Sequence, residues 1–442
     1  MVPFDISPVT PLPEPEIFVD VAIAGAGLGG LALAVGLQER GFESVMLFEA
    51  VPYSRSQTGT IFAMFPNGAK ALEGLKPGRR CDWLRCNGQK RVSVAERPGG
   101  SESSNDSSGE GDVEAVDVVF EVVGSTPETD KTNSTCSVSG GGETPKKSGG
   151  AMEQYQRQLV VVRAKILVAA DGVRSAVRNQ MIGDSPRYLE QIGWNALVPN
   201  PPSARVYPQE HEELLFYMDE VMGYQMYLID IGHGKTFWQV RVLDPDSKLK
   251  SELKLTPFGG FGKPGVNDRL MCHVSKNIAD PSGHDIWHTV LQAVTVTDPG
   301  NIYERYMVDR PPPKDSWSDP KCGNRVVLMG DAAHAMHTGP GQGAQMAFED
   351  AHQLSMCLAD VKDVFDEPAA VAAAVREYEA RRIDRCVRVH AYATGSHGFG
   401  EEGKLVKALS PPEKMKRFME FRSWVHAYPD KIKGDPESTY FK

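Results

Sequence analysis

Three apolar runs along the chain have the length and composition of buried strands. Ile17–Ala24 (IFVDVAIA), Lys165–Asp171 (KILVAAD) and Arg325–Met329 (RVVLM) are rich in Val, Ile and Leu, and a glycine directly follows each of them. Continuous apolar runs are typical of strands that are covered on both faces, as in parallel sheets. Together with Ser44–Ala50 (SVMLFEA), they predict an α/β fold built on a largely parallel sheet.

Helical patterns follow these strands. The apolar spacing predicts helices over Leu31–Arg40, Ala344–Val361 and Pro368–Tyr392, the last beginning at a proline that favours the first helical turn. We expect a solvated or interdomain face on this last helix, formed by its arginines: Arg381, Arg382, Arg385 and Arg388.

The stretch between residues 98 and 158 contains no Leu, Ile or Trp. Its Ser-, Gly- and Thr-rich tracts, 99–111 and 124–157, cannot bury enough apolar surface to offset the entropy of ordering and are predicted to be disordered. Between the tracts, Val116–Val123 is predicted to pair with Gln158–Ala164 in a hairpin, so that the second tract is an insertion at its tip.

Short apolar runs recur between Tyr188 and Asp309 and predict an antiparallel sheet. Residues 223–227 and Phe237-Trp238 either line an apolar pocket or belong to the core of that sheet. The chain is therefore expected to divide into 17–190, a sheet domain over 191–310, a return segment over 311–395 and a C-terminal tail or helix over 396–442.

Composition and charge narrow the class of protein. The 442 residues suit two or three packed units, and 58 acidic against 48 basic residues give a net charge of −10, which argues against nucleic acid as a partner. Seven scattered cysteines without a Cys-x-x-Cys pair indicate neither a disulfide framework nor a zinc site. No Lys or Arg precedes Arg40, so we expect no signal or transit peptide and a soluble, cytoplasmic protein without a transmembrane segment.

The first strand leads into Gly25-Ala26-Gly27-Leu28-Gly29-Gly30, and Glu49 ends the next strand nineteen residues after Gly30. In a strand–loop–helix–strand unit, Gly25 allows the turn, Gly27 lets the backbone approach a diphosphate, and Gly30 lets helix and strand pack closely. An acid in the position of Glu49 accepts hydrogen bonds from ribose hydroxyls. This loop predicts a dinucleotide, with FAD and NAD both open at this point.

The last strand ends in Gly330-Asp331-Ala332-Ala333-His334, and a glycine-rich loop, residues 337–343, leads into the following helix. Asp331 at a strand end is placed to bond a polyol chain, and a helix N-terminus offers partial positive charge to an electron-rich ring. His334 is interpreted as a packing or hydrogen-bonding residue rather than an acid–base catalyst.

In this order the motifs resemble the single-component FAD-dependent monooxygenases of the para-hydroxybenzoate hydroxylase type. The resemblance rests on the Gly25–Gly30 loop, on Asp171-Gly172 with Arg174-Ser175, and on Gly330–His334 with Gly341-Gln342-Gly343. Residues 302–305 and 345–350 look most like zeaxanthin-epoxidase-type members. The resemblance implies a Rossmann-like FAD-binding domain, a mixed β-sheet substrate domain and C-terminal helices.

The resemblance also implies roles for single residues. Gly25, Gly27 and Gly30 would hold the diphosphate, Glu49 the ribose and Asp331 the ribitol, with Asp171 in a structural role between the nucleotide-binding loops. Arg55 would lie near the flavin or diphosphate, and no catalytic residue is assigned, because the cofactor carries the chemistry. The complete set of implied cofactor-binding residues is Gly25, Ala26, Gly27, Leu28, Gly30, Glu49, Arg55, Gly59, Asp171, Gly330, Asp331, Gly341, Gly343 and Ala344.

Such enzymes use NADPH or NADH and O2, and the resemblance implies hydroxylation or epoxidation of an apolar aromatic or isoprenoid small molecule. Two alternatives remain: an FAD-dependent reductase or dehydrogenase of the same fold, and a non-catalytic binding protein like the Rab GDP-dissociation inhibitors. The sequence leaves the substrate, the choice of nicotinamide and the oligomeric state open.

The chain departs from the family pattern at two places. The region after Leu75 is short and has no Arg-x-x-Leu element, which in the family also contacts FAD. In the flavin loop, Thr338 stands where the family usually has a proline, and the proline is Pro340.

Overall fold

The computed structural model of the chain describes residues 15, 17–50, 64–75, 89–95, 115–124, 156–200, 214–219, 224–232, 234–253, 259–275, 286–396 and 400–429. The implied cofactor residues Arg55 and Gly59 lie outside the described residues. The tract 99–111 and most of the tract 124–157 also lie outside them, as does the short region that follows Leu75 up to residue 88.

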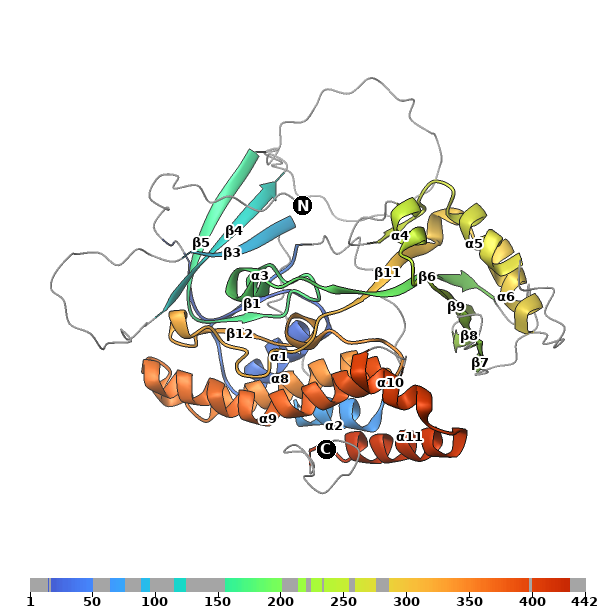
Figure 1. The fold of residues 1–442 in the computed structure, drawn as a ribbon. Coiled ribbons are helices and arrows are strands. Elements are labelled where there is room, and N and C mark those ends of the chain that lie inside the picture. The colour runs from blue at the N-terminus through green and yellow to red at the C-terminus, as the bar shows by residue number, and fades with distance from the viewer. Residues whose placement is uncertain are drawn as a thin grey trace.

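A mixed sheet forms the centre of the molecule (Figure 1). Its order is β2-β1-β5-β4-β3, and β12 pairs with β5 beyond the end of β4. The strands are β1 (Ile17–Ala24), β2 (Val45–Phe48), β3 (Gln89–Ala95), β4 (Val116–Gly124), β5 (Gln156–Ala169) and β12 (Val326–Leu328). β1, β2, β5 and β12 run parallel, as predicted from their apolar runs, and residues 21–24 and 166–169 are fully buried.

The predicted hairpin is confirmed by the antiparallel pairing of β4 with β5. Val116 pairs with Ala164 and Val123 with Arg157, and β3 extends the sheet beyond β4. The tract between the two strands is therefore inserted between paired strands, as the sequence predicted.

Helices cover the parallel part of the sheet and pack on one another (Figure 1). They are α1 (Leu28–Glu39), α2 (Pro66–Gly74), α8 (Gly343–Ala359), α9 (Pro368–Gly395), α10 (Gly400–Ala408) and α11 (Pro411–His426). Small residues allow close packing on α8: a Cβ on Gly29 would lie 3.2 Å from Cβ of Ala347, and one on Gly36 would lie 2.9 Å from Oγ of Ser355. Proline begins α2, α9 and α11, where its missing N–H costs no hydrogen bond.

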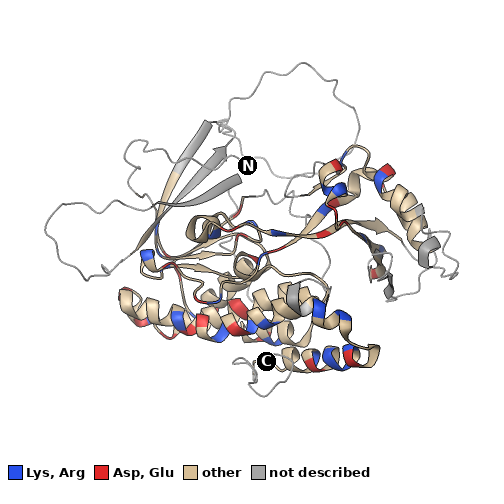
Figure 2. Ribbon diagram, in the orientation of Figure 1, with Lys and Arg blue, Asp and Glu red and all other residues tan. Residues whose placement is uncertain are grey.

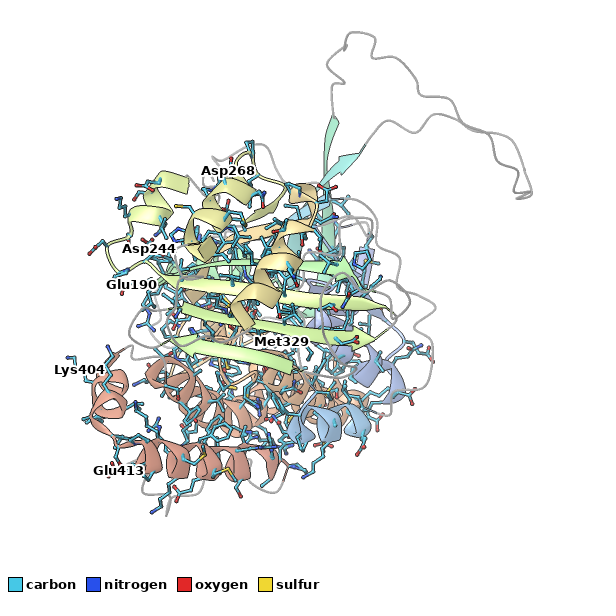
Figure 3. The ribbon with its side chains drawn as sticks, turned by 90° about the vertical axis from the view of Figure 1, so that its right-hand side faces the viewer. Glu190, Asp244, Asp268, Met329, Lys404 and Glu413 are labelled. Atoms are coloured by element: carbon cyan, nitrogen blue, oxygen red, sulfur yellow. The ribbon has the colours of Figure 1, made fainter. Side chains whose placement is uncertain are left out.

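The second sheet is antiparallel, with the order β10-β11-β6-β9-β8-β7. Its strands are β6 (Arg187–Pro199), β7 (Leu214–Asp219), β8 (Tyr224–Gly232), β9 (Lys235–Leu243), β10 (Gly260–Phe261) and β11 (Tyr303–Asp309). Three helices that the sequence analysis did not predict belong to this part of the chain: α4 (Lys248–Leu253), α5 (Val266–Ser275) and α6 (Ile286–Thr295). Figure 3 views the molecule from the side on which α5 and α6 lie.

Alternate residues of the second sheet form a core with α5 and α6. Trp194, Met226 and Trp238 are fully buried in this core, together with Leu270 and Val290 of the two helices. Of the two interpretations of residues 223–227 and Phe237-Trp238, the core interpretation is therefore correct for Met226 and Trp238.

Short elements complete the described chain. They are α3 (Ala176–Ile182), α7 (Asp331–His334) and the 3-10 turns η3 (Pro299–Asn301), η4 (Pro320–Cys322) and η5 (Lys362–Val364). Among the described residues, no helix has both the length and the apolar character needed to cross a membrane.

Candidate functional site

The loop between β1 and α1 is shaped by two glycines that have no room for a side chain. Gly25 has φ +110°, and a Cβ there would lie 2.2 Å from the carbonyl oxygen of Ala170. A Cβ on Gly30 would lie 2.0 Å from the carbonyl oxygen of Gly25. The turn and the close packing expected from the glycine pattern are therefore both present.

Gly27 differs from these two glycines, because a Cβ there would meet nothing within 4 Å. Gly27 is the N-cap of α1, no side chain caps this helix, and Leu28 is exposed. Free N–H groups at a helix N-terminus beside open space are the arrangement that binds phosphate. This part of the site fits the diphosphate of a dinucleotide.

Glu49 lies beside this loop at the end of β2. Its Oε2 atom accepts a hydrogen bond of 2.8 Å from the N–H of Ala26, and its side chain remains partly exposed. The contact fixes the carboxylate at the edge of the glycine loop, where a ribose linked to the diphosphate would lie.

Asp331 begins α7 directly after β12. Gly330 before it has φ +57° and donates its N–H to Oδ2 of Asp350 at 2.8 Å, which fixes the turn. The Asp331 side chain is accessible, yet the protein around it raises its pKa, chiefly through desolvation and further through the charge of Asp350. An accessible carboxylate at the end of a strand fits a group that bonds a polyol chain.

The glycine-rich loop brings the N-terminus of α8 to Asp331. A Cβ on Gly343 would lie 4.0 Å from Oδ1 of Asp331, and Gly341, at φ +67°, packs against the ring of Phe65. The side chain of the N-cap residue, Gln342, does not cap α8, whose first turn includes Ala344. This end of α8 fits the electron-rich edge of a flavin ring.

Asp171 points toward α3 rather than toward this site. Its Oδ2 atom accepts hydrogen bonds from the N–H groups of Ala176, at 2.8 Å, and Val177, at 3.4 Å. Burial raises the pKa of this carboxyl, and the bonds from α3 oppose the rise. The geometry fits the structural role that the resemblance implies for Asp171.

A buried cluster of charges lies beneath the flavin loop, where α8 and α9 pack together. Arg382 contacts both Glu349 and Asp350, and Arg385 donates to Glu349 from Nε at 2.6 Å and from Nη2 at 2.8 Å. All four side chains are completely buried. The prediction that Arg382 and Arg385 belong to a solvated or interdomain face is wrong, because each has a buried carboxylate partner on α8. Figure 2 shows charged residues of both signs where these helices lie side by side.

Two further side chains connect this cluster to the flavin loop and the end of β12. Nδ2 of Asn67 donates to Oε1 of Gln342 and to Oε1 of Glu349, both at 2.9 Å. His334 is fully buried, with Nε2 2.6 Å from Oδ2 of Asp350, which agrees with its interpretation as a hydrogen-bonding residue.

The sequence analysis assigned no role to Asn67, Glu349 or Asp350, although Glu349 and Asp350 lie in a segment that carries the family resemblance. The available signal was the presence of two adjacent acids in a helix whose buried residues are otherwise uncharged. Buried acids require cationic partners, and the arginines of α9 supply them.

Family comparisons agree with this geometry. Two family models, both described as FAD binding domain, match residues 315–390 and 20–70. These ranges contain the Gly330–Ala344 segment with α8, and the glycine loop with Glu49. FAD is therefore the cofactor that the chain is built to bind.

Curated relatives include three named oxygenases. The chain is 29% identical over 259 residues to the aurachin C monooxygenase/isomerase of Stigmatella aurantiaca, covering 58% of this chain and 56% of that protein. It is 27% identical to the 3-amino-4-hydroxybenzoate 2-monooxygenase of Streptomyces cremeus, over 85% of this chain and 86% of that protein. It is 28% identical to the zeaxanthin epoxidase of Nicotiana plumbaginifolia, over 52% of this chain and 30% of that protein. The chain thus spans about half the length of the first relative and about a third of the epoxidase.

Solved structures show the same fold. HpxO of Klebsiella pneumoniae in complex with FAD and uric acid superposes with a TM-score of 0.55 at 21% identity, over 94% of this chain and 97% of that chain. PqsL of Pseudomonas aeruginosa superposes with a TM-score of 0.52 at 15% identity, over 91% of this chain and all of that chain. The predicted fold class and the resemblance to FAD-dependent monooxygenases are confirmed.

Proposed function

We propose that this chain, a relative of the FAD-dependent monooxygenases, uses FAD, NADPH or NADH, and O2 to hydroxylate or epoxidise an aromatic or isoprenoid small molecule. The observation that carries the proposal is the meeting of Asp331 with the N-terminus of α8, where a Cβ added to Gly343 would lie 4.0 Å from Oδ1 of the carboxylate. The relatives named as monooxygenases and epoxidases support the same reaction class.

Each part of the site would bind one part of FAD. The Gly25–Gly30 loop and α1 would hold the diphosphate, and Glu49 would bond the ribose of the adenosine. Asp331 would bond the ribitol chain. The backbone of residues 341–344 would face the flavin ring, where the positive end of the α8 dipole stabilises negative charge by about 0.3–2 kcal/mol.

Bound FAD, once reduced by the nicotinamide, supplies the chemistry that activates O2 and places one oxygen atom on the substrate. The residues of the chain bind and orient FAD and the substrate. The second sheet adjoins the flavin loop, since Gln191 of β6 lies 3.1 Å from Nε2 of His337. Its face toward that loop would position a substrate and exclude water from the ring.

This second sheet favours a monooxygenase over a reductase of the same fold, because a reductase needs no separate surface to hold an organic substrate. The accessible Asp331 and the N-terminus of α8 beside it favour a flavoprotein over a non-catalytic binding protein. The reductase and the non-catalytic binding protein are each distinguished from a monooxygenase by the following experiment.

The test begins with the purified full-length chain and its flavin absorption spectrum, before and after reconstitution with FAD. NADPH and NADH oxidation, hydrogen peroxide release and incorporation of isotopically labelled O2 are then followed with panels of aromatic and isoprenoid compounds. We expect one labelled oxygen atom in a product. A protein that binds no FAD would overturn the proposal, and flavin that turns over without labelling any product would identify the reductase.

A further inference from the structure

The last helix of the described chain, α11, lies on the outside of the helical layer, on the side away from both sheets (Figures 1 and 3). Its inner face is anchored in the protein. Phe421, Trp424 and Val425 are buried, and the ring of Phe421 stacks on that of Tyr392 of α9 with centroids 3.6 Å apart. A capping box at Ser410 fixes the first turn. The orientation of the outer face of α11 is therefore fixed as well.

The outer face of α11 is apolar where a surface helix is normally polar. Met415, Phe418 and Met419 expose 60%, 43% and 53% of their surface. Because they are spaced three and four residues apart, they form one stripe along the helix. A helix that buries its inner face in its own protein and is also apolar on its outer face presents that outer face to a second apolar phase.

Basic side chains accompany this stripe. Lys416 and Arg422 are exposed on the same helix. α11 contains four basic and two acidic residues, although the whole chain carries a net charge of −10. One of the two acids, Glu413, is engaged in the capping box, where its Oε2 atom accepts hydrogen bonds of 2.7 Å from the N–H and 2.6 Å from Oγ of Ser410. The outer face is therefore locally positive on an acidic protein.

These charges distinguish a membrane from a second copy of the chain as the occupant of the outer face. In a two-fold symmetric dimer built on this face, the same positive patch would face its own copy, with Lys416 and Arg422 opposed by like charges. The surface of a bilayer that contains anionic lipid instead attracts basic side chains, and apolar side chains of a helix enter the boundary between headgroups and acyl chains. The outer face of α11 has both features.

The C-terminal end of α11 leads to the flavin loop. His426, the last residue of α11, stacks on Phe65 with ring centroids 5.6 Å apart, and a Cβ on Gly341 of the loop would lie 2.7 Å from the same Phe65 ring. Lys70 of α2 donates to the carbonyl oxygen of His426 at 3.1 Å and adds an exposed basic side chain at this end. A membrane that holds α11 would therefore lie near the flavin loop, since the Phe65 ring joins the loop to this helix.

We propose that the outer face of α11, formed by Met415, Phe418 and Met419 with Lys416 and Arg422, docks on the surface of a membrane that contains anionic lipids. In this arrangement α11 lies in the plane of the interface and inserts only its apolar stripe. The inference goes beyond the proposed function, because it concerns where the chain meets an apolar substrate rather than the reaction that follows.

The test is flotation of the purified full-length chain with lipid vesicles, with and without added FAD. One set of vesicles consists of phosphatidylcholine, and the other contains phosphatidylserine as roughly a third of its lipid. We expect the chain to partition onto the anionic vesicles about tenfold more strongly than onto the neutral ones, and to be released as the salt concentration rises. Flotation requires no flavin turnover, so its outcome is independent of the proposed function.

A pair of glutamine substitutions tests the apolar stripe, since glutamine has nearly the helix propensity of methionine. The double variant Met415→Gln/Met419→Gln is expected to lower the partition coefficient on anionic vesicles by about tenfold. Val364→Gln, at an exposed apolar residue of η5, is the matched control and should leave the partition coefficient unchanged. Melting temperature is measured for every variant, and Met415→Gln alone serves as the milder change if the double variant does not fold.

A second pair of substitutions tests the charges. Lys416→Gln/Arg422→Gln is expected to lower the partition coefficient on anionic vesicles by about tenfold and to leave the weaker binding to neutral vesicles unchanged. Arg376→Gln, at an exposed arginine of α9, should change neither.

Two flotation results would overturn the inference: no flotation of the parent protein with anionic vesicles, and full flotation of a folded Met415→Gln/Met419→Gln protein. Light scattering of the parent protein tests for a second copy on this face. A dimer that the same double variant dissociates would also overturn membrane docking.

Discussion

His334 and Asp350 are held 2.6 Å apart, from Nε2 to Oδ2, and neither side chain is exposed. The same Oδ2 atom accepts the N–H of Gly330, so one carboxylate of α8 fixes both the turn after β12 and the end of α7. Asp331 lies between Gly330 and this histidine in sequence. The pair therefore positions the residue that we assign to the ribitol chain.

The pair predicts a pH dependence of stability. Burial disfavours the charged imidazole, but Cys386 and Asp350 outweigh it and hold the pKa of His334 well above 6.5. Burial is likewise outweighed at Asp350, where His334 and Arg382 lower the pKa to about 2. The histidine contribution is complete below about pH 6.5 and is lost as the pH rises through the folded pKa, and the aspartate contribution is lost as the pH falls toward 2.

Melting temperatures measured between about pH 5 and about pH 9 check this expectation. We expect His334→Gln to lower the free energy of unfolding by about 1.5–3 kcal/mol near pH 6, and the difference from the parent protein to shrink toward high pH. A difference that stays constant across the range would show that His334 is not charged in the folded protein.

The buried cluster predicts a large cost for removing one acid. Glu349→Gln leaves Arg382 and Arg385 without the carboxylate that both contact, so we expect a loss of about 3–5 kcal/mol in the free energy of unfolding. Glu377→Gln is the matched control, since Glu377 pairs with Arg381 at 2.7 Å on the exposed side of α9 and should cost about 0–1 kcal/mol. Denaturant unfolding measures both, and similar losses would contradict the assignment.

The sequence was sufficient for the parts of the fold that are determined locally. The strands β1, β5 and β12 follow from continuous apolar runs, and the Gly25–Gly30 loop from its glycine spacing, because burial on both faces and the lack of room for Cβ leave few other residue types. The hairpin of β4 with β5 also followed from neighbouring apolar segments.

The parts that the sequence did not reveal depend on partners far along the chain. Arg382 and Arg385 resemble surface arginines of an amphipathic helix, and only the packing of α9 on α8 brings them to Glu349. Likewise, the alternation of Trp238, Gln239, Val240 and Arg241 suggests an exposed polar face on β9, but the chain covers that face and buries Gln239 and Arg241.

Two alanine substitutions in the glycine loop should have opposite effects. Gly27 has φ −70° and open space around its Cβ position, so Gly27→Ala should leave the stability of the FAD-free protein unchanged and weaken FAD binding tenfold or more, about 1.4 kcal/mol. Gly30→Ala places Cβ 2.0 Å from the oxygen of Gly25 and should destabilise the FAD-free protein by about 1–3 kcal/mol. Thermal unfolding without FAD and titration with FAD distinguish the effects of the two substitutions. Full FAD affinity in the Gly27→Ala protein would show that the diphosphate is not bound beside Gly27.

Asp331→Asn tests the ribitol contact with almost no change of shape. The carboxylate bonds a hydroxyl more strongly than an amide does, so we expect FAD affinity to fall by about 10- to 100-fold, or about 1.5–3 kcal/mol, while the FAD-free protein keeps its melting temperature. Because desolvation and Asp350 raise the pKa of Asp331, FAD affinity of the parent protein should also fall on acidification, and the fall should be absent in the variant. Asp363→Asn, at an exposed acid of η5, is the control. Equal FAD affinities in the parent protein and the Asp331→Asn variant would show that Asp331 does not contact the cofactor.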